Sequence, residues 1–155
     1  MIRAGKPKKV LFLCTGNSAR SIFAEYFLRE LGKNRFEAHS AGAQPTGTVN
    51  PLTLRVLKGD FHLDAKDSRS KSWDEFRDKK LDLVVTVCDS ARQSCPVFPG
   101  SPKVIHWNIP DPAALSGSEE EKLRAFKAAA QAIRRRVQLL CALPDEKLAT
   151  ITDDR

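Results

Sequence analysis

The sequence VLFLCTGNSARS, from Val10 to Ser21, specifies three elements in immediate succession. Its first five residues, Val10 to Cys14, are all apolar, which is typical of a strand buried on both faces of a sheet. A polar segment with one glycine follows at 15–20, and from Ser21 to Leu31 apolar residues recur with a helical period. We therefore predict a strand, a tight loop, and a helix that Gly32 ends.

The rest of the chain repeats this alternation. We expect further strands at 36–40, 81–88 and 104–109, and helices at 50–58, 73–77 and 118–140. The Cys-, Pro- and Gly-rich segment 89–102 is expected to be a loop, and 144–155 a frayed tail. Alternating strands and helices predict an α/β fold. We expect a single-domain three-layer sandwich over 1–155, with a four-stranded parallel sheet, helices on both faces, and a core at about 8–141.

Composition narrows the possible partners. The chain has 155 residues, about one domain, and is 41% hydrophobic and 29% charged, as globular proteins are. Its net charge of +7 favours anionic partners. The basic residues are scattered, and Arg134–Arg136 fit a solvated helix face, so we expect no nucleic-acid binding. The four cysteines are too few for a disulfide framework, and no apolar run approaches ~18 residues. We expect a cytoplasmic monomer that does not enter a membrane.

The polar loop carries the pattern most specific for function, a Cys and an Arg with five residues between them. It joins a buried strand to a helix, so its backbone N–H groups and the helix N-terminus form a cradle for an oxyanion. Arg20 adds a fork that holds two oxygens, and the same field is expected to lower the pKa of Cys14. Ser21 is placed to hydrogen-bond the thiolate, and Gly16 to turn the loop tightly. The predicted oxyanion-binding residues are Thr15, Gly16, Asn17, Ser18, Ala19 and Arg20.

The alternative interpretation makes Cys14 a buried core cysteine and Arg20 a surface residue. Either residue alone would fit it, but the strand–loop–helix context with this spacing favours the oxyanion site. The loop is not a nucleotide-binding P-loop, because it lacks the Gly-Lys-Ser/Thr ending.

With these residues, the chain resembles the low-molecular-weight protein tyrosine phosphatase fold, and within that fold the arsenate reductases. The eight residues Cys14 to Ser21 match the family signature. The resemblance covers about residues 8 to 140, and its other matches are Ser40-Ala41-Gly42, Val49-Asn50-Pro51, Arg69-Ser-Lys-Ser-Trp-Asp74, His106-Trp107 and Pro110-Asp111-Pro112.

The choice between phosphatase and reductase depends on two further cysteines, Cys88 and Cys95. A hydrolase needs one cysteine, whereas a reductase needs two electrons, which two further thiols supply. Cys88 follows a predicted strand and is expected at the same sheet edge as Cys14. Two alternatives remain open: Cys88 packs in the core, or it joins Cys95 and His106 in a zinc site. Tyrosine phosphatases of this fold carry a Tyr pair after the Asp-Pro, where this chain has Ala113-Ala114, and its single tyrosine is Tyr26.

The resemblance implies a mechanism. Cys14 attacks arsenate, Asp111 protonates the departing oxygen as general acid, Cys88 attacks the adduct, and Cys95 resolves the Cys14–Cys88 disulfide. An external thiol reductant is implied in place of a tightly bound cofactor: thioredoxin, with glutaredoxin or glutathione as alternatives. The alternative function is hydrolysis of phosphomonoesters through a phosphocysteine. Arsenate, phosphate and sulfate are the implied oxyanions.

The resemblance also raises the question of a metal. Some family members hold a potassium ion through residues that match Asn17, Glu25 and Ser40 together with an Asp. In this chain Trp73 takes the place of that Asp, with Asp74 next to it, and we predict no metal site beyond a possible weak potassium site. Cys141 lies beside the apolar stripe of the last long helix and is interpreted as a packing residue.

Overall fold

The fold is built on a parallel sheet with β1 in an inner position. The computed structural model describes residues 6–153 and contains the strands β1 (Lys8–Cys14), β2 (Phe36–Gly42), β3 (Leu83–Thr86) and β4 (Lys103–His106). Their order is β2-β1-β3-β4, and every neighbouring pair is parallel. The continuous apolar run is explained by this position, because β1 pairs on both edges and residues 10–13 are fully buried. The predicted four-stranded parallel sheet is confirmed.

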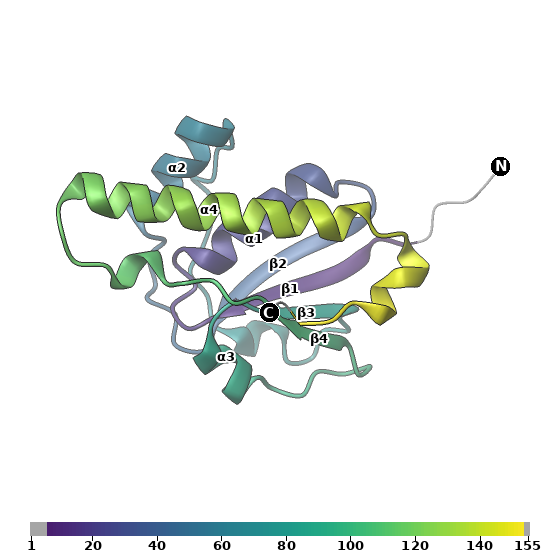
Figure 1. Cartoon of the computed structure of the whole chain (residues 1–155). Coiled ribbons are helices and arrows are strands. Elements are labelled where there is room, and N and C mark those ends of the chain that lie inside the picture. The colour runs from purple at the N-terminus through teal and green to yellow at the C-terminus, as the bar shows by residue number, and fades with distance from the viewer. Residues whose placement is uncertain (1–5, 154–155) are drawn as a thin grey trace.

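Three long helices lie on one side of the sheet. They are α1 (Arg20–Leu31), α2 (Pro51–Phe61) and α4 (Glu119–Ala142), and in Figure 1 they lie above the strands. Helix α2 begins at the N-cap Asn50, whose side chain accepts a hydrogen bond from the Leu52 N–H, and α4 begins with a capping box between Ser118 and Glu121. The predicted apolar stripe of α4 is buried at Phe126, Ala130, Ile133, Val137 and Leu140.

The segment expected to be a loop contains a helix. Residues Asp89–Ser94 form α3, which lies below the sheet in Figure 1. The Cys88 side chain caps its N-terminus by accepting a hydrogen bond from the Ala91 N–H. Ala91 is buried while its neighbours in the helix are exposed. A helix of six residues with a cysteine as its cap carries little sequence signal, which explains why a loop was expected there.

The end of the chain is also more ordered than expected. Residues Asp145–Thr150, within the segment expected to be a frayed tail, form the 3-10 helix η3. Arg35 ties this end down through the carbonyls of Cys141 and Leu143, at 2.7 and 2.6 Å. Asp153 accepts hydrogen bonds from the His106 N–H at 2.9 Å and from Arg92 on α3 at 3.0 Å. Residues 154 and 155 lie outside the described residues.

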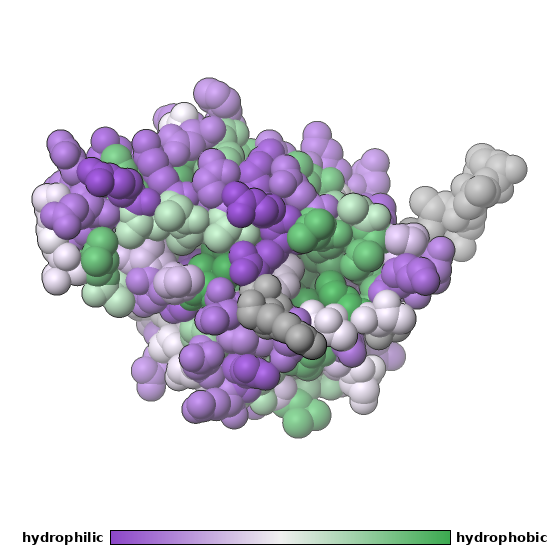
Figure 2. Space-filling model, viewed as in Figure 1, coloured by the Kyte–Doolittle hydropathy of each residue, from purple (hydrophilic) through white to green (hydrophobic). Residues whose placement is uncertain are grey.

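The surface reflects the amphipathic pattern of α4. Figure 2 shows hydrophilic residues along the outward face of the helical layer, as expected for a helix that buries a single apolar stripe. Arg134 is not simply solvated, because it pairs with Glu30 at 2.8 Å and lies over the Phe61 ring. Within residues 6–153, no helix combines the length and the apolar content that crossing a bilayer would require.

Candidate active site

The loop between β1 and α1 places a thiol at its centre. Cys14 ends β1 and is 3% exposed, and Ser21 lies in the first turn of α1. The Ser21 Oγ lies 2.9 Å from the Cys14 Sγ, and the Asn17 backbone N–H donates to the same sulfur at 3.2 Å. The loop therefore wraps around the sulfur and directs hydrogen-bond donors toward it.

Hydrogen bonds from neighbouring segments to its carbonyl groups hold the loop in place. Because the peptide unit is planar and trans, a carbonyl that points outward leaves the N–H of the same peptide pointing inward. Successive inward N–H groups form the cradle that an oxyanion needs. The outward bonds are Ala43 N–H to Cys14 O at 3.1 Å, Gln44 N–H to Thr15 O at 2.9 Å, Thr46 N–H to Gly16 O at 3.0 Å, and Asn50 N–H to Ser18 O at 3.0 Å.

The tight turn is made by Asn17 and not by Gly16. Asn17 has a φ of 49°, in the left-handed region that asparagine tolerates better than most residues. The glycine that the loop requires is Gly42 at the end of β2, because a Cβ there would lie 2.5 Å from the Thr15 carbonyl oxygen. The tight turn predicted for Gly16 thus depends on the left-handed backbone of Asn17 and on the missing Cβ of Gly42. Ala19, at the N-cap of α1, is buried.

Arg20 is fixed beside Asp111. Its side chain is 12% exposed and donates to the carbonyls of Val87 at 3.2 Å and Ile109 at 3.0 Å. One Nη lies 3.6 Å from the Asp111 Oδ2, and the other Asp111 oxygen accepts from the Ala113 N–H at 3.0 Å. The structure therefore brings together the two side chains that were predicted to hold and protonate an oxyanion.

Cys88 lies at the same sheet edge as Cys14. β3 pairs with β1, and Cys88 follows β3 by two residues, so its Sγ comes within 3.3 Å of the Thr15 Oγ1 in the loop. Cys88 is 8% exposed, whereas Cys95 lies at the other end of α3 and is half-buried. All of the cysteines within residues 6–153 are free thiols.

The proposed zinc alternative finds no support in the position of His106. Its Nδ1 lies 2.8 Å from the Thr86 Oγ1, and its Nε2 lies 3.3 Å from the Asp89 Oδ1. Both ring nitrogens thus face oxygen partners and neither faces a cysteine sulfur.

The electrostatics of Cys14 differ from the expectation. Burial raises the pKa of the Cys14 thiol above its ordinary value, so the predicted lowering is wrong. The hydrogen bonds from Ser21 and the Asn17 N–H and the charge of Arg20 lower this pKa, but they do not outweigh the desolvation. Burial likewise raises the pKa of the Cys95 thiol.

The residues considered for potassium form a cluster that already contains a cation. The Lys71 Nζ lies 3.4 Å from the Ser40 Oγ and 3.8 Å from the Glu25 Oε1. Asn17 turns its amide Nδ2 toward Ser40 at 3.0 Å, while its Oδ1 accepts from the Lys71 backbone N–H at 2.9 Å. A potassium ion needs several free oxygen ligands. Here the Lys71 ammonium already faces the Ser40 and Glu25 oxygens, and Asn17 turns its N–H and not its oxygen toward Ser40, so the cluster does not fit the ion. Sequence reasoning missed Lys71, although it stands within the family motif at 69–74.

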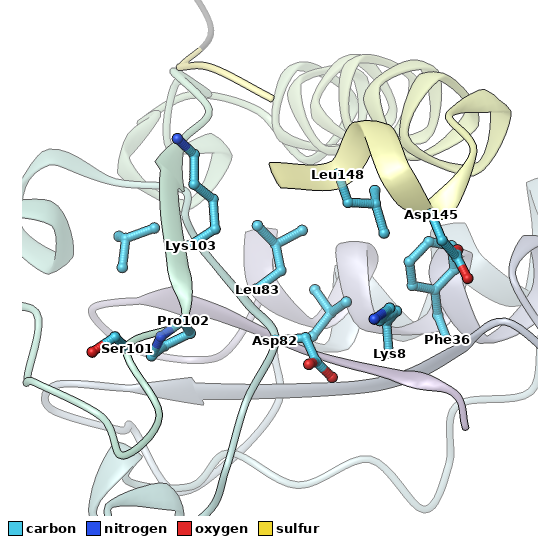
Figure 3. Close-up of a pocket in the computed structure, with 11 residues that line it drawn as sticks. Lys8, Phe36, Asp82, Leu83, Ser101, Pro102, Lys103, Asp145 and Leu148 are labelled. Atoms are coloured by element: carbon cyan, nitrogen blue, oxygen red, sulfur yellow. The ribbon is translucent and has the colours of Figure 1, made fainter. Parts of the chain in front are cut away.

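A hollow of about 690 Å³ lies elsewhere, at the amino ends of the strands. Figure 3 shows Phe36, Leu83 and Leu148 at this place, with Lys8 and Asp82 nearby. The carboxyl ends of the strands, where Cys14 and Cys88 lie, are at the opposite edge of the sheet. Open parallel sheets bind their ligands at the carboxyl ends, so the Cys14 loop is the better candidate site.

A thiol at the centre of a Cys-x5-Arg loop after the first strand defines a class of α/β proteins that bind a tetrahedral oxyanion above a cysteine. The model of the low molecular weight phosphotyrosine protein phosphatase family matches residues 9–150, and the chain belongs to that family. An arsenate reductase from Halalkalibacterium halodurans is 35% identical over 131 residues, which cover 84% of this chain and 93% of that protein.

Two solved structures extend the comparison. The crystal structure of an arsenate reductase from Archaeoglobus fulgidus aligns with a TM-score of 0.68 at 34% identity and covers 86% of this chain and 99% of that one. A thioredoxin-dependent arsenate reductase from Corynebacterium glutamicum aligns with a TM-score of 0.61 at 25% identity and covers 89% of this chain and 65% of that one.

Proposed function

We propose that the protein reduces arsenate to arsenite, with Cys14 as the nucleophile and Cys88 and Cys95 as the source of the electrons. The observation that carries this proposal is the position of Cys88, whose Sγ lies 3.3 Å from the Thr15 Oγ1 in the oxyanion loop. A hydrolase has no use for a second thiol at this place, whereas a two-electron reduction requires one. The similarity to arsenate reductases supports the same conclusion.

The first step is the attack of Cys14 on arsenate. The N–H groups of the loop and the Arg20 fork hold the oxyanion, and the Cys14 thiolate forms a bond to arsenic. Asp111 lies 3.6 Å from Arg20 and gives its proton to the departing oxygen, which leaves as water. Ser21 and the Asn17 N–H donate hydrogen bonds that stabilise the thiolate which attacks. The loop also accommodates phosphate and sulfate, which have the same tetrahedral shape.

The second step transfers the electrons. The Cys88 thiolate attacks the Cys14 sulfur, a disulfide forms, and the sulfur–arsenic bond breaks with its electron pair on arsenic, so arsenic(V) becomes arsenic(III). The Cys95 thiolate then attacks Cys88 and releases the Cys14 thiolate. A helix rises about 1.5 Å per residue, which separates the Cα atoms of Cys88 and Cys95 by about 10 Å across α3. A disulfide needs them within about 7 Å, so α3 unwinds in this step.

Thioredoxin is the proposed reductant of the Cys88–Cys95 disulfide, which is supported by the similarity to a thioredoxin-dependent arsenate reductase from Corynebacterium glutamicum. Glutaredoxin or glutathione is the alternative. The protein needs no tightly bound cofactor in this scheme, because its own thiols carry the electrons. We propose that it works as a cytoplasmic monomer, since the cytoplasm is where thiol reductants keep such cysteines reduced.

The second candidate is hydrolysis of phosphomonoesters, which the family match favours. It would use Cys14, Arg20 and Asp111 in the same roles and end when water releases the phosphate. An aromatic substrate is disfavoured by the residues that follow Asp111, which are Pro112 and two alanines. Tyr26 lies on α1, where it packs against the Arg29 guanidinium at 5.1 Å from the ring centroid.

The test is arsenite formation with thioredoxin, thioredoxin reductase and NADPH. We expect NADPH oxidation that depends on arsenate and on thioredoxin, with one arsenite formed for each NADPH. The same enzyme is assayed with p-nitrophenyl phosphate, and we expect only weak turnover. Turnover of the phosphate ester without any arsenite in either thiol system would support the phosphatase and contradict the proposal. If arsenite forms only with glutaredoxin and glutathione, the proposed reaction stands and thioredoxin is not its reductant.

A further inference from the structure

Lys71 has a buried ammonium close to the nucleophile. It lies between α2 and η1 (Trp73–Phe76), and its side chain is 9% exposed. Besides Ser40 and Glu25, its Nζ contacts the Arg69 carbonyl at 3.0 Å. Burial lowers the pKa of Lys71, and the charge of Glu25 opposes this shift. The other charged groups that act on Lys71 are Arg29 on α1, Glu75 on η1, and Arg69, two residues before it in the sequence.

A continuous chain of hydrogen bonds joins this ammonium to Cys14. The Ser40 hydroxyl donates to the Glu25 Oε1, and the Asn17 Nδ2 donates to the Ser40 Oγ at 3.0 Å. The same Nδ2 donates to the Ser21 Oγ at 2.7 Å, and Ser21 lies 2.9 Å from the Cys14 Sγ. Asn17, Ser21 and Ser40 are fully buried, so water does not compete for these bonds.

The direction of these bonds determines whether the Ser21 hydroxyl donates its hydrogen to the Cys14 sulfur. The Asn17 Oδ1 accepts from the Lys71 backbone N–H, so its Nδ2 points toward the two serines. Ser21 accepts from Nδ2, and its own hydrogen is then available for the sulfur. Ser40 accepts from Nδ2 in the same way, and therefore has to give its hydrogen to Glu25. Lys71 thus orients the Asn17 amide through its backbone N–H and faces Ser40 with its ammonium, at the start of the chain that ends at Cys14.

A buried carboxylate is costly unless cations pair with it. Glu25 is 3% exposed. Arg29 pairs with its Oε2 from a half-exposed position, and Lys71 faces its Oε1, the oxygen that Ser40 also contacts. Lys71 is thus the cation that faces the Glu25 oxygen from which the chain of hydrogen bonds continues through Ser40 to Cys14.

We propose that Lys71 is a positioning residue for the Cys14 nucleophile: its ammonium acts as a built-in cation that pairs with the buried Glu25 and Ser40 and so holds the Asn17–Ser21 donors toward the sulfur, and no free potassium ion is needed. The effect on turnover rests on the proposed function, but the effect on Cys14 does not. The ammonium replaces a bound ion by a tethered one, whose place is fixed by the backbone bonds of the same residue.

The test compares Lys71→Met with Lys66→Met, which removes the same charge from an exposed lysine of the same segment. Cys14 alkylation by iodoacetamide is measured between pH 7 and 9 by peptide mass spectrometry, without arsenate. We expect the Lys71→Met profile to lie about one pH unit higher, which is about tenfold slower alkylation at a given pH. Lys66→Met is expected to follow the wild type. Overlapping profiles for Lys71→Met and the wild type would overturn the proposal.

A second test begins with the wild-type enzyme, for which no variant is needed. Arsenate reduction by the wild-type enzyme is compared in potassium and in choline salts at equal ionic strength, and we expect equal kcat and KM. A kcat that falls on removal of potassium would contradict the built-in cation. In Lys71→Ala, we expect ammonium or potassium chloride to restore part of the alkylation rate that choline chloride does not. If the wild type alkylates normally but forms no arsenite, the proposed function fails while the proposal for Lys71 stands.

Discussion

The oxyanion loop at 14–21 and the segment at 88–95 lie at the same edge of the sheet, but they are held very differently. The loop has four carbonyls bonded to other segments, and its Asn17 and Ser21 are fully buried. The segment at 88–95 is largely the six-residue helix α3, which buries only Ala91 of its own residues and contacts the chain end through an exposed Arg92–Asp153 pair.

The difference corresponds to the two tasks in the proposed reaction. Oxyanion binding and nucleophilic attack require donors that do not move when charge develops, and the loop supplies them. Disulfide exchange requires a sulfur that travels several ångströms, and a short helix with few buried contacts opens at low free-energy cost. One region is therefore built for fixed geometry and the other for local unfolding.

The largest effect is expected from Cys14→Ser. A serine hydroxyl has a far higher pKa than a thiol and cannot replace it as the nucleophile. We expect both arsenate reduction and phosphate-ester hydrolysis to fall below detection, while phosphate still raises the melting temperature because the N–H cradle is unchanged. Appreciable turnover by this variant would mean that the rigid region does not hold the nucleophile.

The next largest effect is expected from Arg20→Lys. A lysine cannot hold two oxygens in a fork, and it also loses the bonds to Val87 and Ile109. We expect kcat/KM for arsenate to fall roughly 100-fold or more, the range seen when one transition-state donor is removed. Near-wild-type kinetics would show that the backbone cradle alone suffices. Arg124→Gln, at an exposed position of α4, serves as the control for loss of a positive charge.

A smaller and graded effect is expected from pH. Burial raises the pKa of Cys95, so at neutral pH its thiol is mostly protonated and its thiolate fraction increases as the pH rises. We expect Cys95 alkylation to accelerate about tenfold per pH unit between pH 7 and 8. Added phosphate is expected to slow alkylation of Cys14, which lies inside the loop, and to leave Cys95 unaffected. A Cys95 rate that levels off below pH 8 would contradict the raised pKa.

The smallest effect is expected from Arg92→Gln, which removes the exposed ion pair between α3 and Asp153 at 3.0 Å. Exposed pairs contribute about 0.2–1 kcal/mol, so we expect the Cys88–Cys95 disulfide to form up to about fivefold faster with almost no change in melting temperature. The rate is followed by quenched-flow alkylation after one turnover. A slower reaction would show that Arg92 assists the exchange and does not restrain α3.

The contrast between the regions also explains what the sequence could predict. The β1 strand, the Cys14–Arg20 loop and the α4 stripe are local patterns with strong periodicity or spacing, and the structure contains all of them. Helix α3 has six residues and is capped by Cys88, so it is too short for a periodic signal. The role of Lys71 depends on contacts with residues 17, 25 and 40, which lie far from it in the sequence. The raised pKa of Cys14 depends on burial, which spacing does not reveal.

The relay itself is tested most directly by mapping disulfides in Cys95→Ser and in the wild type after a single turnover with arsenate. The enzymes are quenched in acid, alkylated and digested without reduction, and the linked peptides are identified by mass spectrometry. We expect a Cys14–Cys88 disulfide in Cys95→Ser, with one arsenite released per enzyme and no further turnover, and a Cys88–Cys95 disulfide in the wild type. Repeated turnover of Cys95→Ser with thioredoxin, or a glutathione adduct on Cys14 in place of either disulfide, would contradict the three-cysteine relay.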